Sequence, residues 1–147
     1  MRARIRRMEQ TKIFAPFFVL ILLTIVVWFY MYARRIPFIT RNRLTPDQLR
    51  PTEFARLSPP DISNPSDNLK NLFELPIIFY ALTLYLFVTK QVDGVYLAAA
   101  WLFVGLRVLH SAVHCTINIV IVRFWLYAVS ALALWFIAIR AVLQMMA

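Results

Sequence analysis

The chain has 147 residues, of which 61% are hydrophobic, and its 16 basic and 7 acidic residues give a formal net charge of +9. A soluble domain of this length needs more polar surface than this composition supplies, whereas an integral membrane protein does not. The basic residues cluster beside apolar runs, which favours contact with lipid headgroups over contact with nucleic acid. The single cysteine, Cys115, excludes a disulfide bond within the chain.

The first apolar run follows a basic segment at residues 1–12. We predict the first membrane span at residues 13–32, because a hydrocarbon core about 30 Å thick needs roughly 20 residues of helix. Aromatic residues near the end of this span are typical of a membrane–water interface: Trp28, Tyr30 and Tyr32. The run is too long for the apolar part of a signal peptide, and no small-residue cleavage site follows it, so we expect it to remain as a helix.

The next segment, residues 34–70, contains six of the eight prolines, and we expect a polar loop there. One short surface helix is predicted within this loop at TPDQLRP. Thr45 stands at its N-cap, Pro46 at the first helical position and Gln48 at the third.

Three further spans complete the predicted fold, at residues 72–88, 95–116 and 123–143. We expect Ser66 or Asp67 to cap the second long helix, and Asn118 to mark the turn between the last two. The predicted fold class is therefore an all-α integral membrane protein, an up-and-down bundle of four transmembrane helices with both termini on one side. The positive-inside rule does not orient this bundle, because each side carries seven basic residues near the spans.

Polar residues interrupt the apolar half of the chain in the segment RVLHSAVHCTINIVIVR, residues 107–123. A charged side chain inside a bilayer costs about 3 kcal/mol, and it normally faces the bundle interior with a partner. Helical spacing places five polar residues of this segment on one face: Arg107, His110, Ser111, His114 and Asn118. Two shorter sets have helical spacing as well: Asp67, Asn71 and Glu74, then Arg123 and Tyr127.

An up-and-down bundle would bring these three sets together in one leaflet, because the second helix enters there, the third leaves and the fourth begins. We expect Glu74 to be the counter-charge for Arg107, Arg123 or a protonated histidine. The pattern therefore predicts one polar site built from three helices. Alternatively, the same residues only join the helices by hydrogen bonds, with Arg123 reaching the interface and Tyr127 belonging to the aromatic belt.

The motifs NLFELP (residues 71–76) and RVLHSAVH…R…Y (residues 107–127) resemble the MAPEG superfamily, the membrane-associated proteins in eicosanoid and glutathione metabolism. The shared elements are Asn-x-x-Glu opening the second helix, Arg-x-x-His on the third and Arg-x-x-x-Tyr opening the fourth, and the resemblance covers about residues 14–140. It implies a four-helix protomer in a homotrimer, with glutathione bound between protomers and the first loop facing the cytoplasm. Family members conjugate glutathione to electrophiles, reduce lipid hydroperoxides or isomerise lipid peroxides, and some bind partners without catalysis.

The resemblance implies a role for each matching residue. Arg123 would stabilise the glutathione thiolate and Tyr127 would donate a hydrogen bond near the sulfur, so we assign catalysis to these two. We assign ligand binding to six others: Lys70, Asn71, Glu74, Arg107, His110 and His114. The chemistry fits, because a thiol with a pKa near 8.5 needs a nearby cation to ionise at neutral pH. Basic side chains also suit the two carboxylates of glutathione, and Glu74 suits its ammonium group.

The chain departs from the family pattern at several positions. Glutathione-active members carry extra arginines before the Asn-x-x-Glu element, where this chain has only Lys70, and Asp67 stands where arginine is common. His114 replaces the tyrosine of eicosanoid-making members, and Phe124 follows Arg123 where some have serine, so a prostaglandin synthase is not indicated.

We therefore predict a multi-pass membrane protein in contact with membrane lipids, with no nucleic-acid partner. Its predicted activity is that of a glutathione-dependent transferase or peroxidase acting on a lipophilic small-molecule substrate. Two alternatives remain. A non-catalytic interaction protein would use the polar network to fix helix packing and trimer register. A metal or haem site would use HSAVHC, where His110 and His114 are four residues apart beside Cys115.

Overall fold

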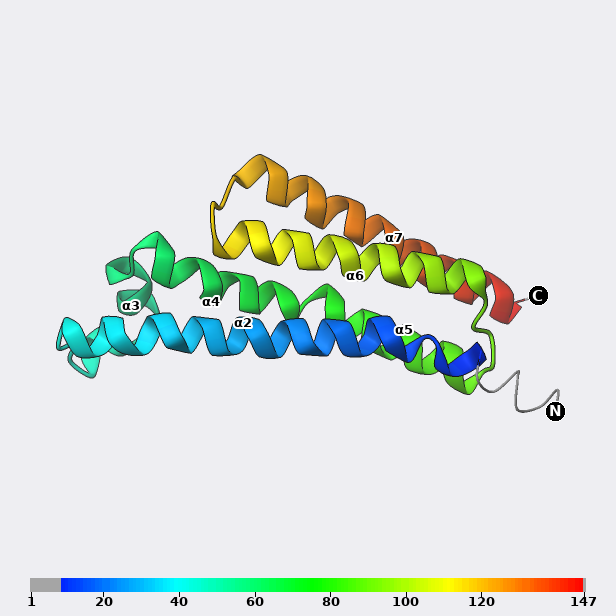
Figure 1. Ribbon diagram of the computed structural model, residues 1–147, viewed down its shortest axis with the longest axis horizontal. Coiled ribbons are helices and arrows are strands. Elements are labelled where there is room, and N and C mark those ends of the chain that lie inside the picture. The colour runs from blue at the N-terminus through cyan, green and yellow to red at the C-terminus, as the bar shows by residue number, and fades with distance from the viewer. Residues whose placement is uncertain (1–8, 147) are drawn as a thin grey trace.

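A computed structural model describes residues 9–146, and within them every regular element is a helix. Four helices are long and apolar enough to cross a membrane: Glu9–Arg41, Pro60–Val88, Gly94–Cys115 and Val120–Met146. They run up and down, so that the first begins and the fourth ends at the same end of the molecule (Figure 1). The predicted all-α, four-helix membrane bundle is confirmed, and the protein is an integral, multi-pass membrane protein. The predicted basic segment, residues 1–12, falls largely outside the described residues.

Helix α2 (Phe14–Arg41) continues well past residue 32, where we predicted the first span to end. Its 28 residues correspond to about 42 Å of helix, which exceeds the roughly 30 Å hydrocarbon core. The last turns therefore extend into the polar region beyond the aromatic belt. Figure 1 shows α2 and α4 reaching beyond the turn that joins α6 and α7.

The segment expected to be a polar loop, residues 34–70, is mostly helical, so that prediction was wrong. After α2 it contains a 3₁₀ turn, η1 (Asp47–Leu49), and two helices, α3 (Pro51–Leu57) and α4 (Pro60–Leu72). Both helices begin with proline at the first helical position. Proline has no backbone N–H, and at this position an N–H would have no partner within the helix. The prolines therefore mark helix starts rather than a loop.

The ends of these helices also differ from the prediction. Ser66 and Asp67 lie inside α4 and cap nothing, because the helix already begins at Pro60. At the predicted surface helix, the Thr45 N–H donates to Gln48 Oε1 at 2.9 Å, as in a capping box. However, the helix there is only the single 3₁₀ turn η1.

The second spanning helix is broken where we expected it to begin. Helix α4 ends at Leu72 and α5 (Leu75–Val88) starts after a break at Phe73 and Glu74. Pro76 explains the break, since proline has no N–H for the preceding turn and its ring clashes with the carbonyl four residues earlier.

The last two helices, α6 (Gly94–Cys115) and α7 (Val120–Met146), are joined by a short turn in the region that Asn118 was expected to mark. Asn118 adopts the left-handed backbone conformation (φ 48°), which asparagine tolerates better than most residues, and its N–H donates to the Val113 carbonyl at 2.7 Å. This turn brings the start of α7 beside the end of α6.

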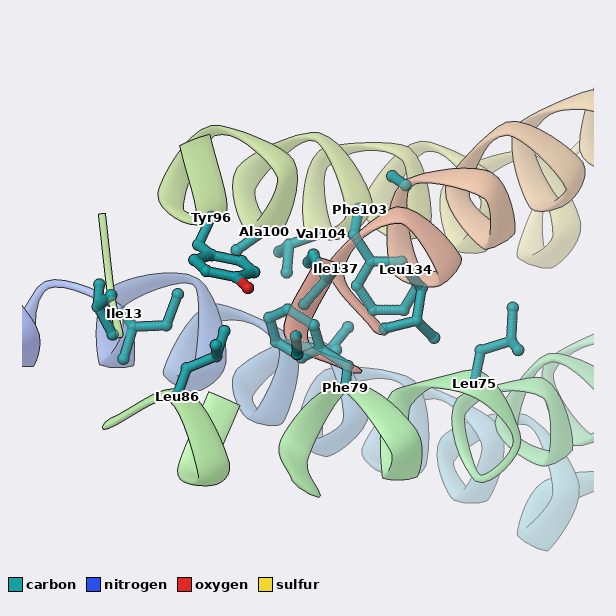
Figure 2. Close-up of a cluster of buried hydrophobic side chains, with 14 of the residues drawn as sticks. Ile13, Leu75, Phe79, Leu86, Tyr96, Ala100, Phe103, Val104, Leu134 and Ile137 are labelled. Carbon is teal, nitrogen blue, oxygen red and sulfur yellow. The ribbon is translucent and has the colours of Figure 1, made fainter. Parts of the chain in front are cut away.

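The apolar core lies between the helices, away from that turn. Figure 2 shows Phe79 of α5, Phe103 of α6 and Ile137 of α7 facing one another, and the rings of Phe79 and Phe103 are 4.9 Å apart between centroids. Large apolar side chains also cover the outside of the bundle, among them Trp125 and Leu132, as a lipid environment requires.

The opposite end of the bundle is held by an ion pair. The Arg140 guanidinium donates to both oxygens of Asp93, at 2.9 and 2.6 Å, and lies 4.1 Å from the ring centroid of Tyr96. Asp93 also caps α6 by accepting from the backbone N–H groups of Val95 and Tyr96. The hydrogen bonds from Arg140 are the largest cause of a lowered pKa for the Asp93 carboxyl.

Candidate functional site

The predicted polar face of the third span exists. Four side chains of α6 are buried on one side of the helix, each no more than 3% exposed: Arg107, His110, Ser111 and His114. Asn118 lies in the turn after α6 rather than on the helix. The polar residues of α4 and α7 meet this face, so the site is built from three helices.

Arg107 contacts the break in the second spanning helix. Its Nη2 donates a hydrogen bond of 2.6 Å to the backbone carbonyl of Asn71, and its guanidinium carbon lies 5.2 Å from the centroid of the Tyr127 ring. The Tyr127 hydroxyl donates to Glu74 Oε2 at 3.2 Å. Within residues 9–146, no carboxylate is within 4 Å of Arg107 or Arg123, so the expected ion pair with Glu74 is not formed.

Arg123 connects α7 to both histidines of α6. Its Nη1 donates to His114 Nε2 at 2.6 Å and to Asn118 Oδ1 at 2.8 Å, while its carbonyl oxygen is 2.9 Å from His110 Nδ1. A guanidinium only donates and a carbonyl only accepts, so His114 accepts through Nε2 and His110 donates through Nδ1. Within the described chain, Arg123 Nε and Nη2 make no hydrogen bond.

Asn68 is fully buried on α4, although the polar pattern of the sequence did not predict it as a site residue. Asn68 accepts from the Ser111 hydroxyl at 3.2 Å and donates to Cys115 Sγ at 3.4 Å. One turn earlier, Asn64 accepts from the Asn118 amide at 3.0 Å. The i, i+4 spacing of Asn64 and Asn68 was the signal that could have revealed this face.

Two residues discussed from the sequence lie apart from this cluster. Asp67 and Lys70 are exposed on α4, and Lys70 Nζ pairs with Asp67 Oδ1 at 2.9 Å. The structure therefore brings together seven of the eight predicted site residues, and Lys70 is not among them. Asn71 takes part through its backbone carbonyl.

Several buried polar atoms of the cluster have no hydrogen-bond partner among residues 9–146. They are Arg107 Nε and Nη1, His110 Nε2 and His114 Nδ1. Leaving such an atom unpaired costs about 1–3 kcal/mol, so these atoms are the ones a bound molecule would satisfy. The Nε–H and the N–H groups of Nη1 point from different sides of the guanidinium, so they would donate to separate acceptor atoms of a bound molecule.

The two histidines can be compared with the ligand set of a metal site. Within residues 9–146, no group of three or more His, Cys, Asp or Glu side chains is placed to hold an ion. His114 Nε2 faces the permanently charged guanidinium of Arg123, which would repel a cation at that nitrogen. Within the described residues, the geometry therefore gives no support for a metal site with three or more such ligands through His110 and His114.

An open groove of about 670 Å³ lies beside the cluster, between α2, α4 and the α6–α7 turn. Cys115 and Asn118 line it together with Arg34 and Asp61, which form an ion pair of 2.6 Å between α2 and α4. The cluster is thus adjacent to an open polar surface.

The profile of the MAPEG family matches residues 13–143, which include every predicted site residue. No curated protein and no solved structure matches the chain. Because the profile covers nearly the whole chain, the polar cluster and nearly all of the four membrane helices fall within the match. This chain belongs to the MAPEG family.

Proposed function

We propose that the protein is a glutathione-dependent transferase or peroxidase that acts on lipophilic electrophiles. The observation that carries this proposal is the set of buried, unpaired nitrogen atoms on Arg107, His110 and His114, at the place where three helices meet. Membership of the family adds glutathione as the expected ligand.

The functional groups of glutathione match the groups of the site. A carboxylate oxygen would accept a hydrogen bond from an unpaired N–H of Arg107, and the ammonium group would bind the exposed carboxylate of Glu74. The thiol would lie beside Arg123 and Tyr127, one helical turn apart on α7. The free Nε and Nη2 of Arg123 would then stabilise the thiolate, which is the reactive form.

The same thiolate supports two reactions. In transfer, a sulfur lone pair forms a C–S bond with the electrophile, whose leaving group departs or whose new carbanion takes a proton. In peroxide reduction, the sulfur attacks the peroxide oxygen and an alcohol leaves. A second glutathione then attacks the oxidised sulfur, which gives a disulfide and water. Lipophilic substrates would enter sideways from the bilayer, which surrounds the site.

A second copy of the chain would complete this site. Glu74 is exposed and Tyr127 is only partly buried, so one side of the cluster is open in the protomer. The family is expected to form homotrimers with glutathione between protomers, and we propose the same assembly here. We also propose that the segment containing α3 faces the cytoplasm, where glutathione is abundant.

Calorimetry on the detergent-solubilised protein tests the proposal, with the ultraviolet absorbance of the glutathione thiolate recorded in parallel. Arg123→Ala should abolish the thiolate signal, while Arg41→Ala is the matched control on the exposed end of α2 and should bind as the wild type does. Absence of glutathione binding by an assembled wild-type protein would refute the proposal.

One observation favours a second candidate function, a non-catalytic interaction protein. Arg123 is already held by His114 and Asn118, which is the arrangement expected if it only stabilises helix packing. In that case Arg123→Ala should disrupt assembly, as measured by size-exclusion chromatography, and the wild type should show no glutathione binding.

A further inference from the structure

The second spanning helix, Pro60–Val88, is interrupted at Phe73 and Glu74. In a continuous helix the N–H of Leu75 would donate to the carbonyl of Asn71, and the N–H of residue 76 to the carbonyl of Leu72. Pro76 has no N–H, and Glu74 has non-helical backbone angles (φ −98°, ψ −100°). Within the described chain, the Asn71 carbonyl therefore lacks the hydrogen bond from Leu75.

Arg107 supplies the missing hydrogen bond from another helix. Its side chain is fully buried, and Nη2 lies 2.6 Å from the Asn71 carbonyl oxygen. A guanidinium keeps its charge in this environment, and hydrogen bonds from a charged donor are about twice as strong as neutral ones. The guanidinium thus caps a carbonyl that the break leaves without its helical partner.

The break determines where Glu74 points. Because Glu74 lies outside both α4 and α5, its side chain reaches Tyr127 on α7, whose hydroxyl donates to it at 3.2 Å. The Tyr127 ring in turn lies over the Arg107 guanidinium. Arg107, Tyr127 and Glu74 are therefore linked by direct contacts.

We infer that Arg107 is a positioning residue: by capping the Asn71 carbonyl it stabilises the Pro76-induced break, and the break holds Glu74 against Tyr127 in the site. The ligand-binding role of Glu74 rests on the proposed function. The coupling between Arg107 and Pro76 does not, and it can be measured without any ligand.

A double-mutant cycle on the detergent-solubilised protein measures this coupling. Arg107→Met leaves the Asn71 carbonyl unpaired and should lower the melting temperature by about 5 °C. Pro76→Ala lets the Leu75 N–H donate to that carbonyl. In this background, Arg107→Met should therefore lower the melting temperature by less than half as much. The effect of losing the buried charge on stability is the same in both backgrounds, so it cancels when the two shifts are compared. Equal shifts in the two backgrounds would overturn the inference.

A second measurement uses only Pro76→Ala, which keeps every charged group. Hydrogen exchange of the Leu75 amide should slow by at least about tenfold in this variant, because the amide gains a helical hydrogen bond. Unchanged exchange would mean that the proline does not free the carbonyl, and it would overturn the inference even if Arg107→Met failed to fold.

Glutathione binding and the thiolate absorbance of Pro76→Ala distinguish a positioning role from a catalytic one. Pro76→Ala should weaken glutathione binding about tenfold, as Glu74→Gln should, because both lose the contact of the carboxylate with the ammonium group. The thiolate absorbance at saturating glutathione should stay unchanged, because Arg123 is untouched. A loss of the thiolate signal with unaltered binding would contradict the positioning role. If the wild type binds no glutathione, the proposed function fails, and the stability cycle still decides the role of Arg107.

Discussion

Arg123 and His114 form the shortest hydrogen bond between two side chains of the polar cluster, with Arg123 Nη1 donating to His114 Nε2 at 2.6 Å. Because the guanidinium can only donate, His114 must be neutral at this nitrogen and carry its proton on Nδ1. The histidine thereby fixes the direction of the arginine that we assign to thiolate stabilisation.

Replacement of His114 tests this relationship. His114→Gln retains an acceptor at the end of the side chain, so Arg123 should keep its position and the glutathione thiolate signal should persist. His114→Phe removes the acceptor and leaves Arg123 Nη1 with Asn118 alone. The thiolate signal should then fall about tenfold, the usual effect of one lost charge-assisted hydrogen bond. Equal signals from the two variants would show that the contact does not orient Arg123.

The network around Asn68 should contribute to stability, whereas its neighbour Asp67 should not. Asn68→Ala leaves the Ser111 hydroxyl without its acceptor and opens a small cavity, so it should lower the free energy of unfolding by about 2 kcal/mol. Asp67→Ala removes only an exposed pair with Lys70 and should cost no more than about 0.5 kcal/mol. Reversible unfolding in mixed micelles compares the two. A larger effect at Asp67 would contradict the orientation of α4.

Tyr127 has two contacts that can be separated. Tyr127→Phe keeps the ring over Arg107 and removes the hydrogen bond to Glu74, so stability should change by less than about 1 kcal/mol. Tyr127→Ala removes the ring as well and should cost about 3 kcal/mol. Thermal unfolding followed by circular dichroism gives both values. Similar losses for the two variants would mean that the hydroxyl, and not the ring, stabilises the cluster.

The ion pair at the far end of the bundle predicts a dependence of stability on pH. The pKa of Asp93 is lower in the folded protein than in the unfolded chain, chiefly because Arg140 donates to the carboxylate. A lowered carboxyl pKa contributes stability that is complete above the unfolded value, about 3.9, and is lost as the pH falls through the folded value. The melting temperature of the wild type should therefore decrease below about pH 4.

Asp93→Asn is the control for that dependence. The amide oxygen still caps α6, but the side chain does not titrate, so the difference from the wild type should be constant above about pH 5 and shrink below about pH 4. A constant difference down to pH values near 3 would show that Asp93 does not carry the acid sensitivity.

Much of the fold follows from the sequence, because hydrophobicity and helical periodicity are local properties. Four apolar runs of sufficient length predicted four spans, and the spacing of Arg107, His110, Ser111 and His114 predicted one buried face of α6. The same spacing argument failed on α4. A shift of one residue turns a side chain by about 100°, and only packing against α6 shows that Asn68 rather than Asp67 is buried.

Two further features depended on the tertiary structure. The composition of residues 34–70 does not distinguish prolines that begin helices, as in α3 and α4, from prolines in a loop. The prediction of a loop there was therefore wrong. The partners of the charged groups also could not be read from the sequence. Coulomb attraction alone favours Glu74 with Arg107, but the break at Pro76 turns Glu74 toward Tyr127 and leaves Arg107 to bind a backbone carbonyl. The sequence by itself determined that four apolar runs form helices long enough to cross a membrane, and which face of α6 is polar. Only the tertiary structure decided the partners within that polar cluster, because a hydrogen bond depends on distances between helices that are far apart in the chain.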